Sequence, residues 1–190
     1  MLHHSKRIFG VLGAAVVSGL LLRGCLLPML AHSRMGAQAE VCSEHVKTLT
    51  RALLAYADDH AGRFPDPASW CDSLVPYVSS RTVFTCPAAH DLRCGYAFNA
   101  AAGAVNARGV SDPRYLILVF ESDAGWNAAG GAELLPVVPR HDRSITDMIG
   151  TADGTASQIV RKRAGSPDQS ISSRTVWLKE YANPAFRWRP

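Results

Sequence analysis

The distribution of apolar residues predicts a membrane-spanning helix near the start of the chain. Residues 8–31 are apolar with few exceptions, and about 20 residues suffice to cross the hydrocarbon core of a bilayer as a helix. Lys6 and Arg7 precede this run and favour a cytoplasmic N-terminus. A cleaved secretory leader has the same plan, but the only sequence resembling its cleavage site is the faint lipoprotein box at 22–25. We therefore expect a cytoplasmic stub at 1–7 and a transmembrane segment at 8–31.

A second pattern continues the helix beyond the apolar run. Between residues 33 and 60, apolar side chains recur at alternating spacings of four and three, which places them on one helical face; they are Cys42, Val46, Leu49, Leu53 and Tyr56. Gly62 and the prolines that follow it predict the end of the helix. Residues 32–62 are therefore expected to form an exported, amphipathic continuation of the transmembrane helix.

Beyond the helix the pattern becomes that of strands. Residues 115–120 are a continuous apolar run of strand length, as in the centre of a sheet. Two further strand-like runs, 145–152 and 155–162, flank Asp153 and Gly154. An Asp-Gly pair in this position favours a two-residue hairpin turn, in which both residues have positive φ.

These elements place the chain in the α+β class. A short helix at 69–75 and an edge strand at 175–178 complete the predicted elements of a small globular domain at 63–190. We expect the long N-terminal helix to pack on a small antiparallel sheet.

Composition agrees with one modest domain outside the membrane segment. The chain has 190 residues, of which 47% are hydrophobic and 19% charged, which leaves room for a single core. Its formal charge of +4 is spread along the chain without a dense Lys/Arg run, so nothing indicates nucleic-acid binding.

Cysteine usage favours an oxidising compartment. The chain has five cysteines and no C-x-x-C unit, which argues against a zinc ribbon or a dithiol redox motif. Cys25 lies in the apolar run, which leaves Cys42, Cys71, Cys86 and Cys94 to share one compartment after export. Of their three possible connectivities we favour Cys86–Cys94 with Cys42–Cys71. Free buried thiols that act as small hydrophobic side chains are the alternative.

An ordered series of short motifs resembles one family of bacterial proteins. The series comprises residues 26–66, VFTCP at 83–87, GYAFN at 95–99, LILVFES at 116–122 and RHDRSITDMIGTADG at 140–154. It resembles the type IV pilin and pseudopilin-like proteins of the prepilin-like H-X9-DG (DUF1559) group. The positions that carry the resemblance are Tyr56, Pro65, Trp70, Cys86, Pro87, Asn99, Glu121, His141, Asp153 and Gly154.

The resemblance implies a pilin-like fold and a structural role. The first half of the helix would span the inner membrane, and the second half would pack on the small sheet of a periplasmic or extracellular domain. Such a protein would be a subunit of a type II secretion or type IV pilus-like apparatus. Its partners would be inner-membrane lipid and other pilin-like subunits, and it would be neither an enzyme nor a cofactor-binding protein.

Two departures from the family pattern keep a second function open. The expected processing site, Gly10 followed by Val11, lacks the Phe that usually follows this glycine. There is also no acidic residue before Glu40, whereas the family has a Glu a few residues into the apolar run. A periplasmic binding protein that is anchored but does not polymerise is therefore the alternative.

The sequence offers few candidates for chemistry. His141 and Asp153 are weak candidates for a metal or acid/base site, although Asp153 is more simply a turn residue and His141 a loop residue. Glu121 and Asp123 could form a carboxylate pair, but acids at strand ends are usually exposed. Motifs for a nucleophile, a P-loop or an EF-hand are missing. An exported hydrolase that uses His141 and Asp153 is the least favoured function.

Overall fold

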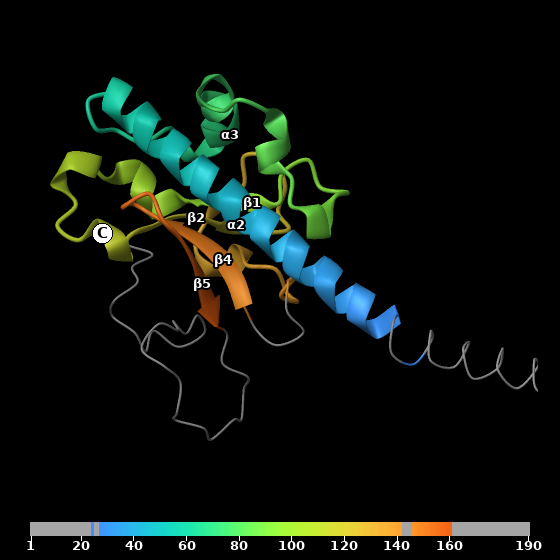
Figure 1. Ribbon diagram of the computed structural model, residues 1–190. Coiled ribbons are helices and arrows are strands. Elements are labelled where there is room, and N and C mark those ends of the chain that lie inside the picture. The colour runs from blue at the N-terminus through green and yellow to red at the C-terminus, as the bar shows by residue number, and fades with distance from the viewer. Residues whose placement is uncertain (1–23, 25–26, 142–145, 161–190) are drawn as a thin grey trace, which may run out of the picture. The chain divides into compact units, whose positions relative to one another are not determined.

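The computed structural model describes Gly24 and residues 27–141 and 146–160 (Figure 1). The helices are α2 (Leu27–Asp59) and α3 (Trp70–Leu74), and the strands are β1 (Tyr96–Asn99), β2 (Ile117–Glu121), β3 (Ala129–Gly130), β4 (Thr146–Thr151) and β5 (Ala156–Val160). Several 3-10 turns connect them. Within the described residues, the predicted short helix at 69–75 and the predicted strand at 115–120 are both confirmed within two residues at each end.

The chain divides into two compact units, residues 1–37 and 38–190, and the fold below is that of the second. Most of the predicted transmembrane segment at 8–31 lies outside the described residues, as do the stub at 1–7, the Gly10–Val11 site and the strand at 175–178. Among the residues that are described, none of the helices combines the length and the apolar character needed to cross a membrane.

Helix α2 buries the face that its sequence predicts. Cys42, Val46, Leu49 and Leu53 are fully buried, and Tyr56 is half-buried. Beyond the helix the chain turns through Ala61 and Gly62, both with positive φ. The Gly62 N–H donates a hydrogen bond of 2.6 Å to the carbonyl of Ala57 and so caps the helix. The predicted glycine stop is therefore confirmed.

The sheet has the strand order β3-β1-β2-β4-β5, with β2 in the middle. Strands β1, β2, β4 and β5 pair antiparallel with their neighbours, whereas the short β3 pairs parallel to β1. The expectation of a wholly antiparallel sheet is wrong in this respect. The loop after β2 returns along β1 in the direction of that strand, and the N–H of Phe98 donates to the carbonyl of Ala128 at 2.9 Å.

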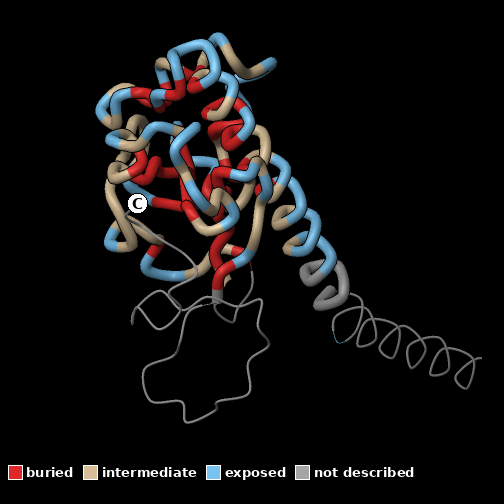
Figure 2. The backbone as a smooth tube through the Cα atoms, turned by 90° about the vertical axis from the view of Figure 1, so that its left-hand side faces the viewer, coloured by how far each residue is buried: buried red, intermediate tan, exposed pale blue. Residues whose placement is uncertain are grey.

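Both faces of the sheet are buried. The part of α2 from Gln38 onward lies across one face (Figure 1), and the buried residues gather where helix and sheet meet (Figure 2). The other face forms a second, smaller cluster covered by Leu134 and Leu135, and it comprises Ala97, Ile117, Phe120, Ile149 and Ile159. Helix and sheet are in close contact at Gly150 of β4, where a Cβ would collide with the Thr50 hydroxyl of α2 and press on Val46.

The predicted hairpin is confirmed, but its turn is different. Strands β4 and β5 pair antiparallel from Thr146–Val160 to Gly150–Ala156. The Gly154 N–H donates to the Thr151 carbonyl at 2.9 Å, and the Thr151 N–H donates to the Thr155 carbonyl at 3.0 Å. This closes a three-residue loop in which only Gly154 has positive φ. The two-residue turn was therefore wrong, because the Asp153 side chain bonds both flanking threonines and stabilises the longer loop.

Candidate functional site

The candidate site forms around Glu121, the last residue of β2. This carboxylate is fully buried, so the expectation of an exposed acid at the strand end is wrong. One oxygen, Oε2, accepts from the Met148 N–H at 2.8 Å, and the other, Oε1, lies 2.7 Å from Nε2 of His141. Because an ionised carboxylate only accepts hydrogen bonds, Nε2 is the donor in this pair. His141 lies in a loop, as expected from the sequence, but it is buried, with only 6% of its surface exposed.

Two cysteines complete the site, in a pairing that differs from the predicted one. Cys42 of α2 and Cys86 form a disulfide with their Cα atoms 5.6 Å apart. Cys71 and Cys94 are free buried thiols with their sulfur atoms 3.9 Å apart. The predicted pairs Cys86–Cys94 and Cys42–Cys71 are therefore wrong. Cys42 is the first residue on the buried face of α2. The burial of this face places its sulfur atom next to that of Cys86.

Four ligand-type side chains converge at this point. Sulfur atoms of Cys42 and Cys86, a carboxylate oxygen of Glu121 and a ring nitrogen of His141 all lie within 4.8 Å of one another, and all four residues are buried. Among the described residues they are the single group of three or more potential metal ligands. If the Cys42–Cys86 disulfide were reduced, a metal held by four buried side chains would be structural rather than catalytic.

The other predicted metal candidate, Asp153, is not part of this group. Its carboxylate accepts hydrogen bonds from the hydroxyl groups of Thr151 at 2.7 Å and Thr155 at 2.8 Å. Of the two weak candidates named from the sequence, only His141 therefore belongs to the group of potential ligands. The turn role that the sequence also suggested for Asp153 is confirmed.

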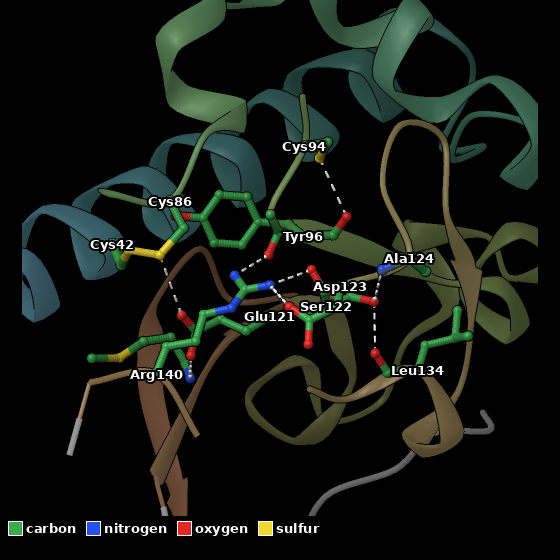
Figure 3. Close-up of polar contacts among 12 residues, drawn as sticks. Cys42, Cys86, Cys94, Tyr96, Glu121, Ser122, Asp123, Ala124, Leu134 and Arg140 are labelled. Carbon is green, nitrogen blue, oxygen red and sulfur yellow. Dashed lines mark hydrogen bonds and ion pairs between the residues drawn. A yellow bond between two sulfur atoms is a disulfide. The ribbon is translucent and has the colours of Figure 1, made fainter. Parts of the chain in front are cut away.

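Arg140 fixes the loop that carries His141. Its guanidinium donates to the carbonyl of Gly95 at 2.9 Å and to that of Ser122 at 2.6 Å, and it pairs with the Asp123 carboxylate (Figure 3). These three acceptors lie at the adjacent ends of β1 and β2. The geometry suits the planar fork of arginine.

Two buried polar atoms at the site have no hydrogen-bond partner among the described residues: Nδ1 of His141 and the hydroxyl of Tyr96. Burial raises the pKa of Tyr96 well above its usual value, and the negative charge of Glu121 adds to the effect. Figure 3 shows the Tyr96 ring with its hydroxyl end toward Cys86. The hydroxyl is therefore protonated and available as a donor.

The remaining signature residues have structural roles. Trp70 donates from its indole nitrogen to the Ala128 carbonyl at 2.9 Å, and Asn99 donates to the Ile117 carbonyl at 2.8 Å. The others are in core, turn and stacking positions: Tyr56 stacks on His60, Pro65 is buried, Pro87 begins a 3-10 turn and Gly154 supplies the positive φ of the hairpin loop.

The sequence named four of the site residues but not their convergence. Cys42 and Cys86 were predicted as disulfide residues, and Glu121 and His141 were named as positions of the family resemblance. Arg140 and Tyr96 were missed. The available signal was Glu121 itself, because an acid that directly extends a fully apolar strand is adjacent to the core.

Comparison with known proteins yields no relative. No protein-family model matches the chain, and neither a curated protein nor a solved structure resembles it significantly.

Proposed function

We propose that this protein is a membrane-anchored, pseudopilin-like subunit of a type II secretion or type IV pilus-like apparatus. In this function the apolar segment at 8–31 crosses the inner membrane with the N-terminus in the cytoplasm. The domain described above then lies on the periplasmic or extracellular side. The disulfide Cys42–Cys86 is compatible with that oxidising side.

The observation that carries the proposal is that the earlier and later turns of α2 differ in burial. From Cys42 to Ala57 one face of this helix is buried in the core of the second unit. From Ser33 to Val41 every described side chain is exposed or half-buried. A pilin-like subunit uses its N-terminal helix in this manner, because the later turns support the sheet and the earlier turns serve the membrane and neighbouring subunits.

Val41 marks the change between these two parts. It is a large apolar residue that is 43% exposed, although it adjoins the fully buried Cys42. In the proposed function, Val41 is a position at which the helix of a neighbouring subunit would contact α2.

The test is site-specific photo-crosslinking in native membranes. A photoreactive amino acid is placed at Val41, and the matched control carries it at Asp58, an exposed position near the other end of the same helix. We expect adducts with a second copy or another pilin-like subunit at Val41 and none at Asp58. Release of the unprocessed protein by an alkaline wash, together with no adduct at Val41, would contradict the proposal.

The second candidate is an anchored periplasmic binding protein that does not polymerise. The observation that favours it is the absence of any acidic residue before Glu40, together with the atypical Gly10–Val11 junction. Intact mass of the mature protein separates the two functions. Loss of the first ten residues with N-methylation supports assembly, whereas an uncut N-terminus in the membrane supports the binding protein.

A further inference from the structure

We propose that Cys42, Cys86, His141 and Glu121 bind one zinc ion when the two thiols are reduced. Zinc and the Cys42–Cys86 disulfide are then alternative states of one site. This inference does not rest on the proposed pilin-like function, because it uses only side chains that converge within 4.8 Å in the described domain.

The chemistry of the donors selects the metal. The site offers two thiolate sulfurs, one imidazole nitrogen and one carboxylate oxygen, which is a four-ligand set of the kind that zinc accepts in structural sites. Calcium and magnesium require six or more oxygen ligands, and a site with one carboxylate and two sulfurs cannot supply them. Soft thiolates together with imidazole favour zinc among the divalent ions.

The observed spacing is close to that of a tetrahedron. Zinc bonds of about 2.3 Å to sulfur and about 2.0–2.1 Å to nitrogen and oxygen give ligand-to-ligand edges of about 3.3–3.8 Å. Sγ of Cys86 lies 3.4 Å from Nε2 of His141 and 3.8 Å from Oε1 of Glu121, so two edges already fit. The Nε2–Oε1 distance of 2.7 Å must lengthen by about 0.6 Å when zinc replaces the shared proton.

The sulfur atoms make the largest movement. On reduction they separate from bonding distance to about 3.8 Å, which rotation about the Cα–Cβ bonds of Cys42 and Cys86 supplies. Their Cα atoms, 5.6 Å apart, need little displacement, so the same backbone holds both states.

The surroundings of the four ligands are suited to the charge of such a site. Two thiolates and one carboxylate around a divalent ion leave one net negative charge. Arg140, which precedes the ligand His141 in the chain, supplies a positive charge nearby. Only 6% of its side chain is exposed. Glu121 is oriented through its second oxygen by the Met148 N–H, as outer partners commonly orient metal ligands. The Tyr96 hydroxyl has no hydrogen-bond partner among the described residues and points toward Cys86 in Figure 3. In the zinc state it gains a thiolate acceptor.

Reduction of the disulfide and binding of zinc convert one state into the other. A dithiol reductant passes two electrons and two protons to the Cys42–Cys86 bond, so the bond breaks, two thiols form and the reductant becomes a disulfide. Zinc then binds and releases the two thiol protons to solvent, while the single proton of the neutral His141 imidazole moves from Nε2 to Nδ1 and frees Nε2 for the metal. A disulfide oxidant reverses the sequence by taking two electrons, re-forming the bond and releasing zinc.

The experiment measures metal binding by the full-length protein in detergent, first oxidised and then reduced by a dithiol. We expect the reduced protein to retain one zinc ion per chain after dialysis and the oxidised protein to retain none. Cobalt in place of zinc should give thiolate charge-transfer bands and the intense visible bands of a tetrahedral ion. These readouts need no variant. Retention of zinc by both forms, retention by neither, or an octahedral cobalt spectrum would overturn the proposal.

Variants then assign the ligands. His141→Ala and Cys42→Ser should each weaken zinc binding by more than the roughly 10–100-fold that loss of an outer partner costs. The matched control is the double variant Cys71→Ser/Cys94→Ser, which removes the other buried thiol pair and should bind zinc as the parent does. Loss of binding in this control alone, with His141→Ala unchanged, would place the metal elsewhere and refute the site.

Discussion

Replacing Gly150 by alanine tests the contact that joins helix α2 to the sheet. Gly150 lies on the helix-facing side of β4, and a Cβ there would lie 2.9 Å from Cγ1 of Val119 and 3.1 Å from Cγ1 of Val46. It would come closer still to the hydroxyl oxygen of Thr50. All three neighbours are fully buried, so none can move aside into solvent.

The expected cost is about 2–3 kcal/mol in the free energy of unfolding. Overpacking a well-filled core by one methyl group costs about 1–3 kcal/mol. The hydroxyl of Thr50 is held by its hydrogen bond to the Val46 carbonyl at 2.7 Å, and breaking that bond to make room costs about 1 kcal/mol. The gain from a stiffer unfolded chain, about 0.4–1 kcal/mol for Gly→Ala, offsets only part of this.

The assay is urea unfolding of the full-length protein in detergent, followed by tryptophan fluorescence. The matched control is Gly109→Ala, because Gly109 is exposed and a Cβ there meets nothing within 4 Å. We expect the control to lie within about 0.5 kcal/mol of the parent. Gly150→Ala should lower the midpoint with an unchanged slope.

A double variant identifies the partner. Thr50→Ala removes the atom nearest to the new methyl group, so Gly150→Ala/Thr50→Ala should be more stable than the sum of the single changes by about 0.5–3 kcal/mol. If Gly150→Ala is no more destabilising than Gly109→Ala, or if the two changes are simply additive, the packing of α2 on β4 described above is wrong.

Three further predictions concern the disulfide, the hairpin loop and the loop of the site. Non-reducing peptide mapping should recover Cys42 joined to Cys86, and replacing both by serine should lower the free energy of unfolding by about 4 kcal/mol, because the residues are 44 positions apart. Burial alone would raise the pKa of Asp153, but hydrogen bonds led by that from Thr151 outweigh it and lower the pKa. The carboxylate therefore stabilises the folded state above about pH 4 and ceases to do so as the pH falls through the lowered folded pKa. In urea titrations Asp153→Asn should be less stable than the parent at pH 7 and equal to it near pH 2, and a difference that persists there would count against this cause. Arg140→Lys keeps the charge but cannot reach both backbone carbonyls, so thermal unfolding should show a loss of about 1–3 kcal/mol.

Local sequence patterns predicted α2, α3, β2, β4 and β5, but neither β1 nor β3. The spacing of Cys42, Val46, Leu49 and Leu53 determines which face of α2 is buried, because a helix places residues three and four apart on one side. The apolar run before Glu121 likewise predicted the central strand. Both depend on neighbours along the chain, so they can be read without knowing where the chain goes next.

What the sequence alone could not determine was the site. Glu121 bonds His141, which is 20 positions away, and Cys42 pairs with Cys86, which is 44 positions away. Their convergence depends on where the loops cross the end of β2. The cysteines closest in sequence, Cys86 and Cys94, are not paired, because the backbone directs each thiol to a different neighbour. Sequence patterning determined the long helix, the central strand β2 and the hairpin of β4 and β5. Only the tertiary structure decided which side chains meet, because chain separation says little about distance once a helix covers a sheet.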